Sequence, residues 1–333
     1  MGNTCSGSPK RGSVRDLRNS FVTGASSSVL GKTHDPAFKW KVYGFSALLE
    51  KGTIPAYSDF FHCSGYTWYL KLSPMDKQSG TEIPYVALSL CLSRNNIKEH
   101  CSIKAVFEIS IYNHSNGTYC GYQASYRFRF KKIKSDIMWL IPLEELLKSS
   151  DFLVDDSCVF GVRVTKAGVS SPKKNTVVAP ERPISVQNLF LQKKEFIKGT
   201  YTWTSNNFLD LKQHLIFSPA FKVVGHTWYI TVYPRGDCWS TSSLSMYLRM
   251  HGSNELPADS GMMIEITLSI LDQEHGKKHL SRQGRVVFAG KRAWGWCDFI
   301  PLKTLKDPSK GYLVGSKCIV KADITIIGST NDA

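Results

Sequence analysis

The first residues whose types could support chemistry stand at the start of the chain, which reads MGNTCS. Gly2 followed by Ser6 fits the acceptor pattern for N-myristoylation, and Cys5 stands where a palmitate is often added to a myristoylated chain. One myristoyl chain binds a membrane only marginally, so stable anchoring takes a second acyl chain or a basic cluster. We therefore expect lipidation of Gly2 and Cys5. The alternative is a chance match of a short pattern in an unmodified leader.

Residue patterns typical of catalysis or metal binding are not found. The chain has no Gly-x-Ser-x-Gly nucleophile turn, no His-Glu-x-x-His zinc motif, and no catalytic Cys/His pair with supporting context. His275 and His279 have the spacing of a metal pair only on a helix, and the EHGKKH stretch around them is typical of an exposed turn between strands. We expect no enzymatic activity, no cofactor and no metal site.

The net charge of the chain is +15, with 42 Lys and Arg against 27 Asp and Glu. An excess of this size is compatible with binding to nucleic acid or to an anionic surface. The alternative function is therefore a basic protein that binds nucleic acid or an anionic surface, or else an enzyme with an unrecognised site. The basic residues are spread through the chain, without the interleaved aromatic residues on which single-stranded nucleic acid stacks. We expect a solvated, lysine-rich surface and no nucleic-acid partner.

One decapeptide occurs twice, and the rest of the chain is arranged around it. Residues 65–74 read GYTWYLKLSP, and residues 225–234 read GHTWYITVYP. In both copies apolar residues alternate with other residues, as in a half-buried β-strand, and a Gly and a Pro bound the run. Ile-Pro-Leu follows at 141–143 and again at 300–302, and its distance along the chain from the decapeptide is almost the same in both copies. The sequence therefore predicts a tandem duplication.

Strand-like runs recur within each copy, with turn residues between them. Alternating apolar residues occupy 86–92 in the first copy and 244–250 in the second. Short strands at regular spacing predict an all-β fold with two tandem antiparallel β-sandwiches of seven to eight strands each.

Changes in composition place the boundaries of these units. Residues 1–35 are rich in Ser, Gly and Thr, and their apolar residues follow neither the period of a helix nor that of a strand. They are expected to form a disordered tail. We expect the two sandwiches at 36–165 and 190–328. Residues 166–189 contain three prolines and no sustained period, which is typical of a linker.

These motifs resemble those of the MATH domain, the sandwich also found at the C-terminal end of the TRAF adaptors. The resemblance rests on the Gly-x-Thr-Trp-Tyr…Pro strand, on Ile-Pro-Leu before a short helix, and on a final strand with a cysteine, in the same order in both copies. The tandem arrangement resembles the plant TRAF-like family of double-MATH proteins. The resemblance implies a non-enzymatic adaptor in which a shallow groove across one sheet binds a short extended peptide of a partner protein.

Mapped by motif, the resemblance implies four groove aromatics: Tyr85 and Tyr126 in the first repeat, and Trp294 and Trp296 in the second. Each repeat has only half of the family's pattern. Ser135 and Ile137 occupy the Trp-Gly-aromatic positions of the first repeat, and Ser243 occupies the first Tyr position of the second. Ordinary packing at the sandwich edge is the alternative for all four aromatics.

The location follows from the tail and from the cysteines. Nine cysteines without a secretory signal indicate reduced thiols in the cytosol. With the acylated tail, we expect the protein on the cytoplasmic face of the plasma membrane as a lipid-anchored peripheral protein, or otherwise in the cytoplasm.

Overall fold

The computed structural model describes residues 30–332 apart from 51, 170–183, 194–195, 207, 209–212, 252–259, 277 and 290–292. Most of the predicted tail, with the lipidation candidates Gly2 and Cys5, lies outside the described residues. At the end of that tail the prediction of disorder is wrong. Strand β1 (Gly31–Lys32) pairs there with β8 (Thr118–Arg129).

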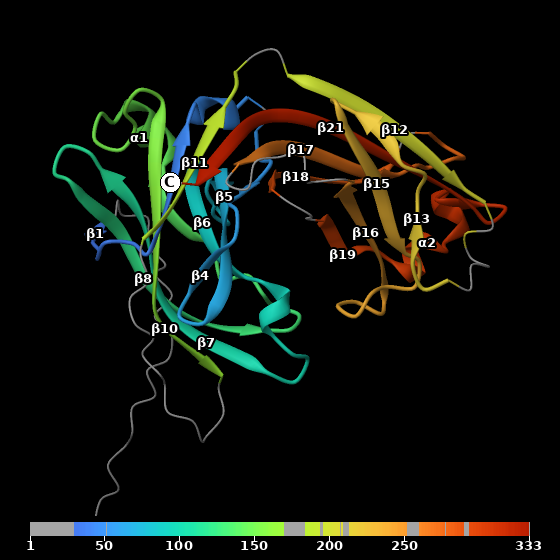
Figure 1. The fold of residues 1–333 in the computed structure, drawn as a ribbon, viewed down its shortest axis with the longest axis horizontal. Coiled ribbons are helices and arrows are strands. Elements are labelled where there is room, and N and C mark those ends of the chain that lie inside the picture. The colour runs from blue at the N-terminus through green and yellow to red at the C-terminus, as the bar shows by residue number, and fades with distance from the viewer. Residues whose placement is uncertain are drawn as a thin grey trace, which may run out of the picture.

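The first repeat forms a two-layer antiparallel β-sandwich, as predicted (Figure 1). One layer consists of β1, β8, β7 (Ser102–Asn113), β10 (Ser157–Val169) and β2 (Phe38–Tyr43). The other consists of β3 (Ala56–Tyr57), β4 (Phe61–Cys63), β5 (Tyr66–Lys77), β6 (Pro84–Leu92) and β9 (Met138–Pro142). Three short helical segments connect these strands: η1 (Phe45–Leu48), η2 (Arg94–Asn96) and α1 (Leu143–Lys148).

The second repeat has the same two layers. One layer consists of β12 (Ile197–Ser205), β21 (Lys317–Asp332), β17 (Ser260–Ile270) and β18 (Leu280–Phe288), with β20 (Leu313–Val314) beside β21. The other consists of β13 (Ile216–Phe217), β14 (Phe221–Val223), β15 (His226–Tyr233), β16 (Ser243–Met250) and β19 (Ala293–Pro301). Helix α2 (Leu302–Leu305) follows Ile-Pro-Leu, as α1 does, and η4 (Pro308–Lys310) comes next. None of the described helices is long and apolar enough to cross a bilayer.

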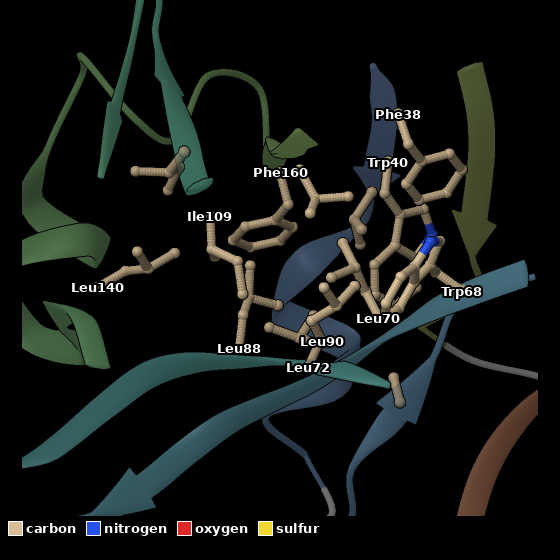
Figure 2. Close-up of a cluster of buried hydrophobic side chains, with 14 of the residues drawn as sticks. Phe38, Trp40, Trp68, Leu70, Leu72, Leu88, Leu90, Ile109, Leu140 and Phe160 are labelled. Carbon is tan, nitrogen blue, oxygen red and sulfur yellow. The ribbon is translucent and has the colours of Figure 1, made fainter. Parts of the chain in front are cut away.

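Alternation along the strands builds the two cores, because successive side chains of a strand point to opposite faces. Figure 2 shows side chains of β5 and β6 packed against those of β2, β7 and β10. The buried side chains labelled there include Phe38, Trp40, Trp68, Leu70, Leu72, Leu88, Leu90, Ile109 and Phe160. A second core forms around Trp228. Three residues of the second repeat, Met263, Val287 and Ile327, join the first core, so the repeats also bury surface against each other.

The duplication is visible in individual contacts as well as in the topology. Trp68 and Trp228 are fully buried, and each indole nitrogen donates a hydrogen bond of 3.0 Å to a backbone carbonyl five residues earlier. Each of these rings meets a phenylalanine of the opposite layer at 5.2 Å, Phe128 in the first repeat and Phe288 in the second. Matched burial and matched partners show that the signature strand sets the same core in both halves.

A strand within the predicted linker joins the two sandwiches. Strand β11 (Ser185–Leu191) pairs in parallel with β2 and antiparallel with β21, and 166–169 extend β10. The prediction of an irregular segment over 166–189 is therefore wrong at both of its described ends. It fails because one of the two inward side chains of β11 is polar, so the run lacks an apolar stripe. Gln187 is 1% exposed and accepts a hydrogen bond of 3.0 Å from the Asp59 amide, and Leu189 is fully buried.

A buried arginine fixes the repeats against each other at a second point. Arg285 in β18 is 1% exposed, and its Nε donates to the Glu265 carboxylate at 3.1 Å. Its Nη1 donates to the carbonyl oxygens of Leu48 and Ile54 in the first repeat, at 2.8 and 3.4 Å. The guanidinium thus bonds a carboxylate of its own repeat and the backbone of the other.

We predict that Trp228→Ala lowers the free energy of unfolding by about 3–5 kcal/mol, through lost burial and the cavity that remains. Trp228→Phe keeps an aromatic ring against Phe288 and loses the indole hydrogen bond, so its cost should be smaller. Denaturant unfolding of both variants measures the difference. A loss below about 1 kcal/mol for the alanine variant would contradict the burial of this ring.

Candidate functional site

At one side of each sandwich a strand of one layer lies beside a strand of the other layer, and we call this side the opening of the sandwich. In the first repeat it lies between β8 and β9, and in the second between β18 and β19. Three of the four predicted groove residues border these openings: Tyr126 stands in β8, and Trp294 and Trp296 stand in β19. The predicted peptide groove would therefore lie at these openings.

The first repeat fills the opening of the second. Strand β3 lies parallel to β18, and the Arg285 amide donates a hydrogen bond of 3.0 Å to the Pro55 carbonyl. The ring of Tyr57 lies 4.6 Å from that of Trp294, and the two rings close over Gly284, where a Cβ would already lie 3.7 Å from both. Burial raises the pKa of Tyr57 well above its usual range. The chain thus places an extended segment with one aromatic side chain at this edge.

The two tryptophans of the predicted motif are partly buried in this packing. Trp296 lies 6.1 Å from Phe299, between ring centroids, and both tryptophans pack against the second core. Trp294 also meets Tyr69 of the first repeat at 6.2 Å, and its indole nitrogen is buried without a hydrogen-bond partner. Trp294 therefore takes part in the contact between the repeats. Peptide binding at Trp294 and Trp296 stays a prediction.

The opening of the first repeat has no strand of this kind beside it in the described chain. The described part of the chain covers β8 from this side at β1, which pairs with positions 120–121, and at Thr33, whose amide donates a hydrogen bond of 2.9 Å to the Tyr119 carbonyl. The position equivalent to Trp294 is filled by a small residue: Ser135 bonds to the backbone of Leu90, just as Trp294 pairs with Leu248. The motif comparison had placed Ser135 at this position, and the pairing agrees with it.

Tyr126 and Tyr85 lie at opposite ends of β9. Tyr126 is half-buried, 4.9 Å from Phe128, and burial together with the nearby Asp136 carboxylate raises its pKa. Tyr85 stands in β6 opposite Pro142, the last residue of β9. At about 3.3 Å per residue, an extended peptide of five or six residues along β9 would reach from one tyrosine to the other.

The outer face beside β9 carries two lysines and one aspartate, which the family motifs do not include. Burial, and then the neighbouring Lys134 ammonium, lower the pKa of Lys71. Asp76, on the same face, accepts a hydrogen bond of 2.8 Å from the indole of Trp139. The outward position of Lys71 follows from alternation in the signature strand, whereas Lys134 stands in an irregular segment with no such signal. Two neighbouring ammonium groups favour an anionic group on the ligand.

Comparison with known proteins gives the family. The MATH domain family model matches residues 37–164 and 200–324, one segment in each repeat. Ubiquitin C-terminal hydrolase 12 of Arabidopsis thaliana is 31% identical over 127 residues, which are 38% of this chain and 11% of that protein. A MATH domain and coiled-coil domain-containing protein of Arabidopsis thaliana is 30% identical over 145 residues, 40% of this chain and 42% of that protein.

Two further relatives carry TRAF names. TNF receptor-associated factor homolog 1a of Arabidopsis thaliana is 28% identical over 139 residues, 41% of this chain and 13% of that protein. A solved structure of TRAF5 from Notothenia coriiceps is 23% identical, with a TM-score of 0.33 over 39% of this chain and 74% of that one. The chain spans less than half of the length of each of these three Arabidopsis relatives. Because the family model matches most of the chain, and matches both repeats, this protein belongs to the MATH domain family.

Proposed function

We propose that this protein is a non-enzymatic adaptor that binds short extended peptides of partner proteins in the β8–β9 opening of its first repeat. The observation that carries the proposal is the chain's own use of the equivalent opening. There the two residues of β3 add to β18, and the Tyr57 ring packs on Trp294. A peptide from another protein can use the first opening in the same way, by pairing its backbone with an edge strand and placing a side chain between the layers.

The chemistry of the opening defines the ligand further. A peptide along β9 has Tyr126 at one end and Tyr85 at the other, and Lys71 and Lys134 lie on the adjoining face. We therefore expect an apolar or aromatic residue near Tyr126 and an acidic residue near the lysines. A short peptide in a shallow opening binds weakly, with a Kd on the order of micromolar to near-millimolar, or about 4–8 kcal/mol.

The tail adds a second part to this proposal. Gly2 and Cys5 would carry myristate and palmitate, which hold the adaptor on the cytoplasmic face of the plasma membrane. Support for this part comes from the sequence pattern and from the weakness of a single acyl anchor.

We predict that alanine at Tyr126 or Tyr85 weakens peptide binding at least tenfold without unfolding the protein. Peptides selected from a random library against the full chain would serve as ligands, and titration calorimetry would give the affinities. Phe190→Ala, which removes another aromatic ring that is 41% exposed, is the matched control. Lys134→Glu should weaken the binding of acidic peptides. Unchanged affinity in both tyrosine variants would show that these residues only pack at the edge of the sandwich and do not bind the peptide.

The opening of the second repeat should become accessible to solvent when the Tyr57 side chain is truncated. We predict that Tyr57→Ala increases hydrogen exchange of the β18 amides at 280–288, because the ring that holds β3 against Trp294 is lost. Tyr57→Phe keeps the ring and should exchange like the wild type. Mass spectrometry of peptides from this region measures the effect, and equal protection in all three proteins would show that Tyr57 does not close the opening.

The anchoring proposal predicts an order among variants of the tail. Gly2→Ala should release the protein to the cytosol, because myristoylation normally precedes palmitoylation. Cys5→Ser should leave weak, dispersed membrane association, since one acyl chain binds with K of about 10⁴ per molar. Neutralising Lys10, Arg11, Arg15 and Arg18 should have the smallest effect. Cell fractionation gives the distribution, and a Gly2→Ala protein that stays with the plasma membrane would rule out acylation.

A further inference from the structure

The second repeat carries an uncovered counterpart of the segment that fills its own opening. Strand β13 (Ile216–Phe217) pairs with β15 in the register in which β3 pairs with β5, so Phe217 corresponds to Tyr57. The ring of Phe217 lies 5.9 Å from that of Tyr229, and the ring of Tyr57 lies 6.2 Å from that of Tyr69. The environments differ, because Tyr57 packs against Trp294 whereas Phe217 is 55% exposed.

The first repeat carries the counterpart of the edge that receives Tyr57. Ser125 in β8 pairs with Val106, as Arg285 in β18 pairs with Glu265. Ala124 stands next to Ser125, where β18 has Gly284. No strand of the described chain pairs with 123–128 on the outer side of β8. Within the described part of the chain, a donor segment and an acceptor edge of the same kind thus have no further strand beside them.

The two free surfaces lie far apart. In Figure 1, β8 lies on the left and β13 on the right, and β18, which pairs with β3, lies between them. They cannot meet within one chain in this arrangement, whereas they can meet between two copies. An interface that joins two different surfaces in this way is heterologous, and it continues as a row unless the rotation between copies closes it into a ring.

We propose that the chain self-associates head to tail, with β13 and Phe217 of one copy adding to the free edge of β8 in a second copy. The contact repeats between molecules what β3 and Tyr57 make with β18 inside one molecule. In this proposal a second copy of the chain is one ligand of the β8–β9 opening. The proposal therefore rests on the proposed function, which uses the same opening.

The intermolecular contact is weaker than the internal one. The acceptor edge has Ser125 and Val106 in place of the buried pair of Arg285 and Glu265, and Ser135 in place of Trp294. The internal junction is also favoured because its two surfaces belong to one chain, at an effective concentration in the millimolar range. We expect a Kd on the order of 10–100 micromolar between copies, so that association is set by local concentration.

The test uses sedimentation velocity of the full chain, made without acylation, from 1 to 200 micromolar (about the range the expected Kd requires). Phe217→Ser removes the donor ring from an exposed site. Ser125→Pro removes the acceptor amide that corresponds to the Arg285 amide, and an edge strand tolerates proline where its N–H faces away from the sheet. Phe60→Ser, at another exposed aromatic residue, is the control.

The wild type and the Phe60→Ser protein should show sedimentation coefficients that rise with concentration. Phe217→Ser and Ser125→Pro should each raise the Kd at least tenfold. Mixing these two variants should restore association as a 1:1 dimer and nothing longer, because each supplies the surface that the other lacks. Circular dichroism melting confirms that both variants are folded.

Three results would overturn the proposal: a wild type that is monomeric throughout, association that Phe217→Ser does not weaken, and a mixture of variants that does not dimerise. None of these disproves peptide binding, because Phe217→Ser leaves the β8–β9 opening intact. A selected peptide should bind that variant with wild-type affinity, which separates a failure of self-association from a failure of the proposed function.

Discussion

The arrangement of the two repeats depends on how the charge of Arg285 is satisfied. A guanidinium at 1% exposure is costly unless its donors are paired, and here they reach Glu265 and two backbone carbonyls of the first repeat. Removing one partner of a buried ion pair typically costs about 3–5 kcal/mol, because the other charge remains buried. The residues around Ile54 are thereby held beside β18. Strand β3 follows directly, so the same bonds also place Tyr57 on Trp294.

The two copies of the duplication have kept one core and changed their edges. The contacts of Trp68 and Trp228 are equivalent to within a tenth of an ångström. At the edges, Arg285 corresponds to Ser125, and Trp294 corresponds to Ser135. Core positions tolerate little change because interiors are close-packed, whereas an edge can exchange a large aromatic residue for a serine. The difference leaves one opening filled from inside the chain, whereas no strand among the described residues fills the other.

Alternation predicted the part of the fold that hydrophobic burial determines. The signature strands, both cores and the outward position of Lys71 follow from period two, and the resemblance to the MATH domain included both segments that the family model matches. The junction could not be predicted in that way. Gln187 is buried but polar, so β11 has no apolar stripe, and the two residues of β3 are too few to show a period. Both β3 and β11 form because they pair with strands that are distant in the sequence.

For the candidate site, the sequence indicated residue types and positions but could not give their surroundings. Tyr126 borders an opening, as the motif comparison implied, while Trp294 lies against Tyr57 of the other repeat. A family pattern records which side chains occur at an edge. It does not record that a second domain of the same chain covers that edge, because the covering segment belongs to another part of the sequence.

The position of β11 between β2 and β21 has a consequence for the order of assembly on the ribosome. Residues 185–191 can pair with β2 soon after they emerge, but their other partner, 328–332, is translated much later. During that interval the nascent chain presents an unpaired strand edge next to a finished sandwich, and such edges attract other strands. That exposure ends only when β21 has been made and pairs with β11.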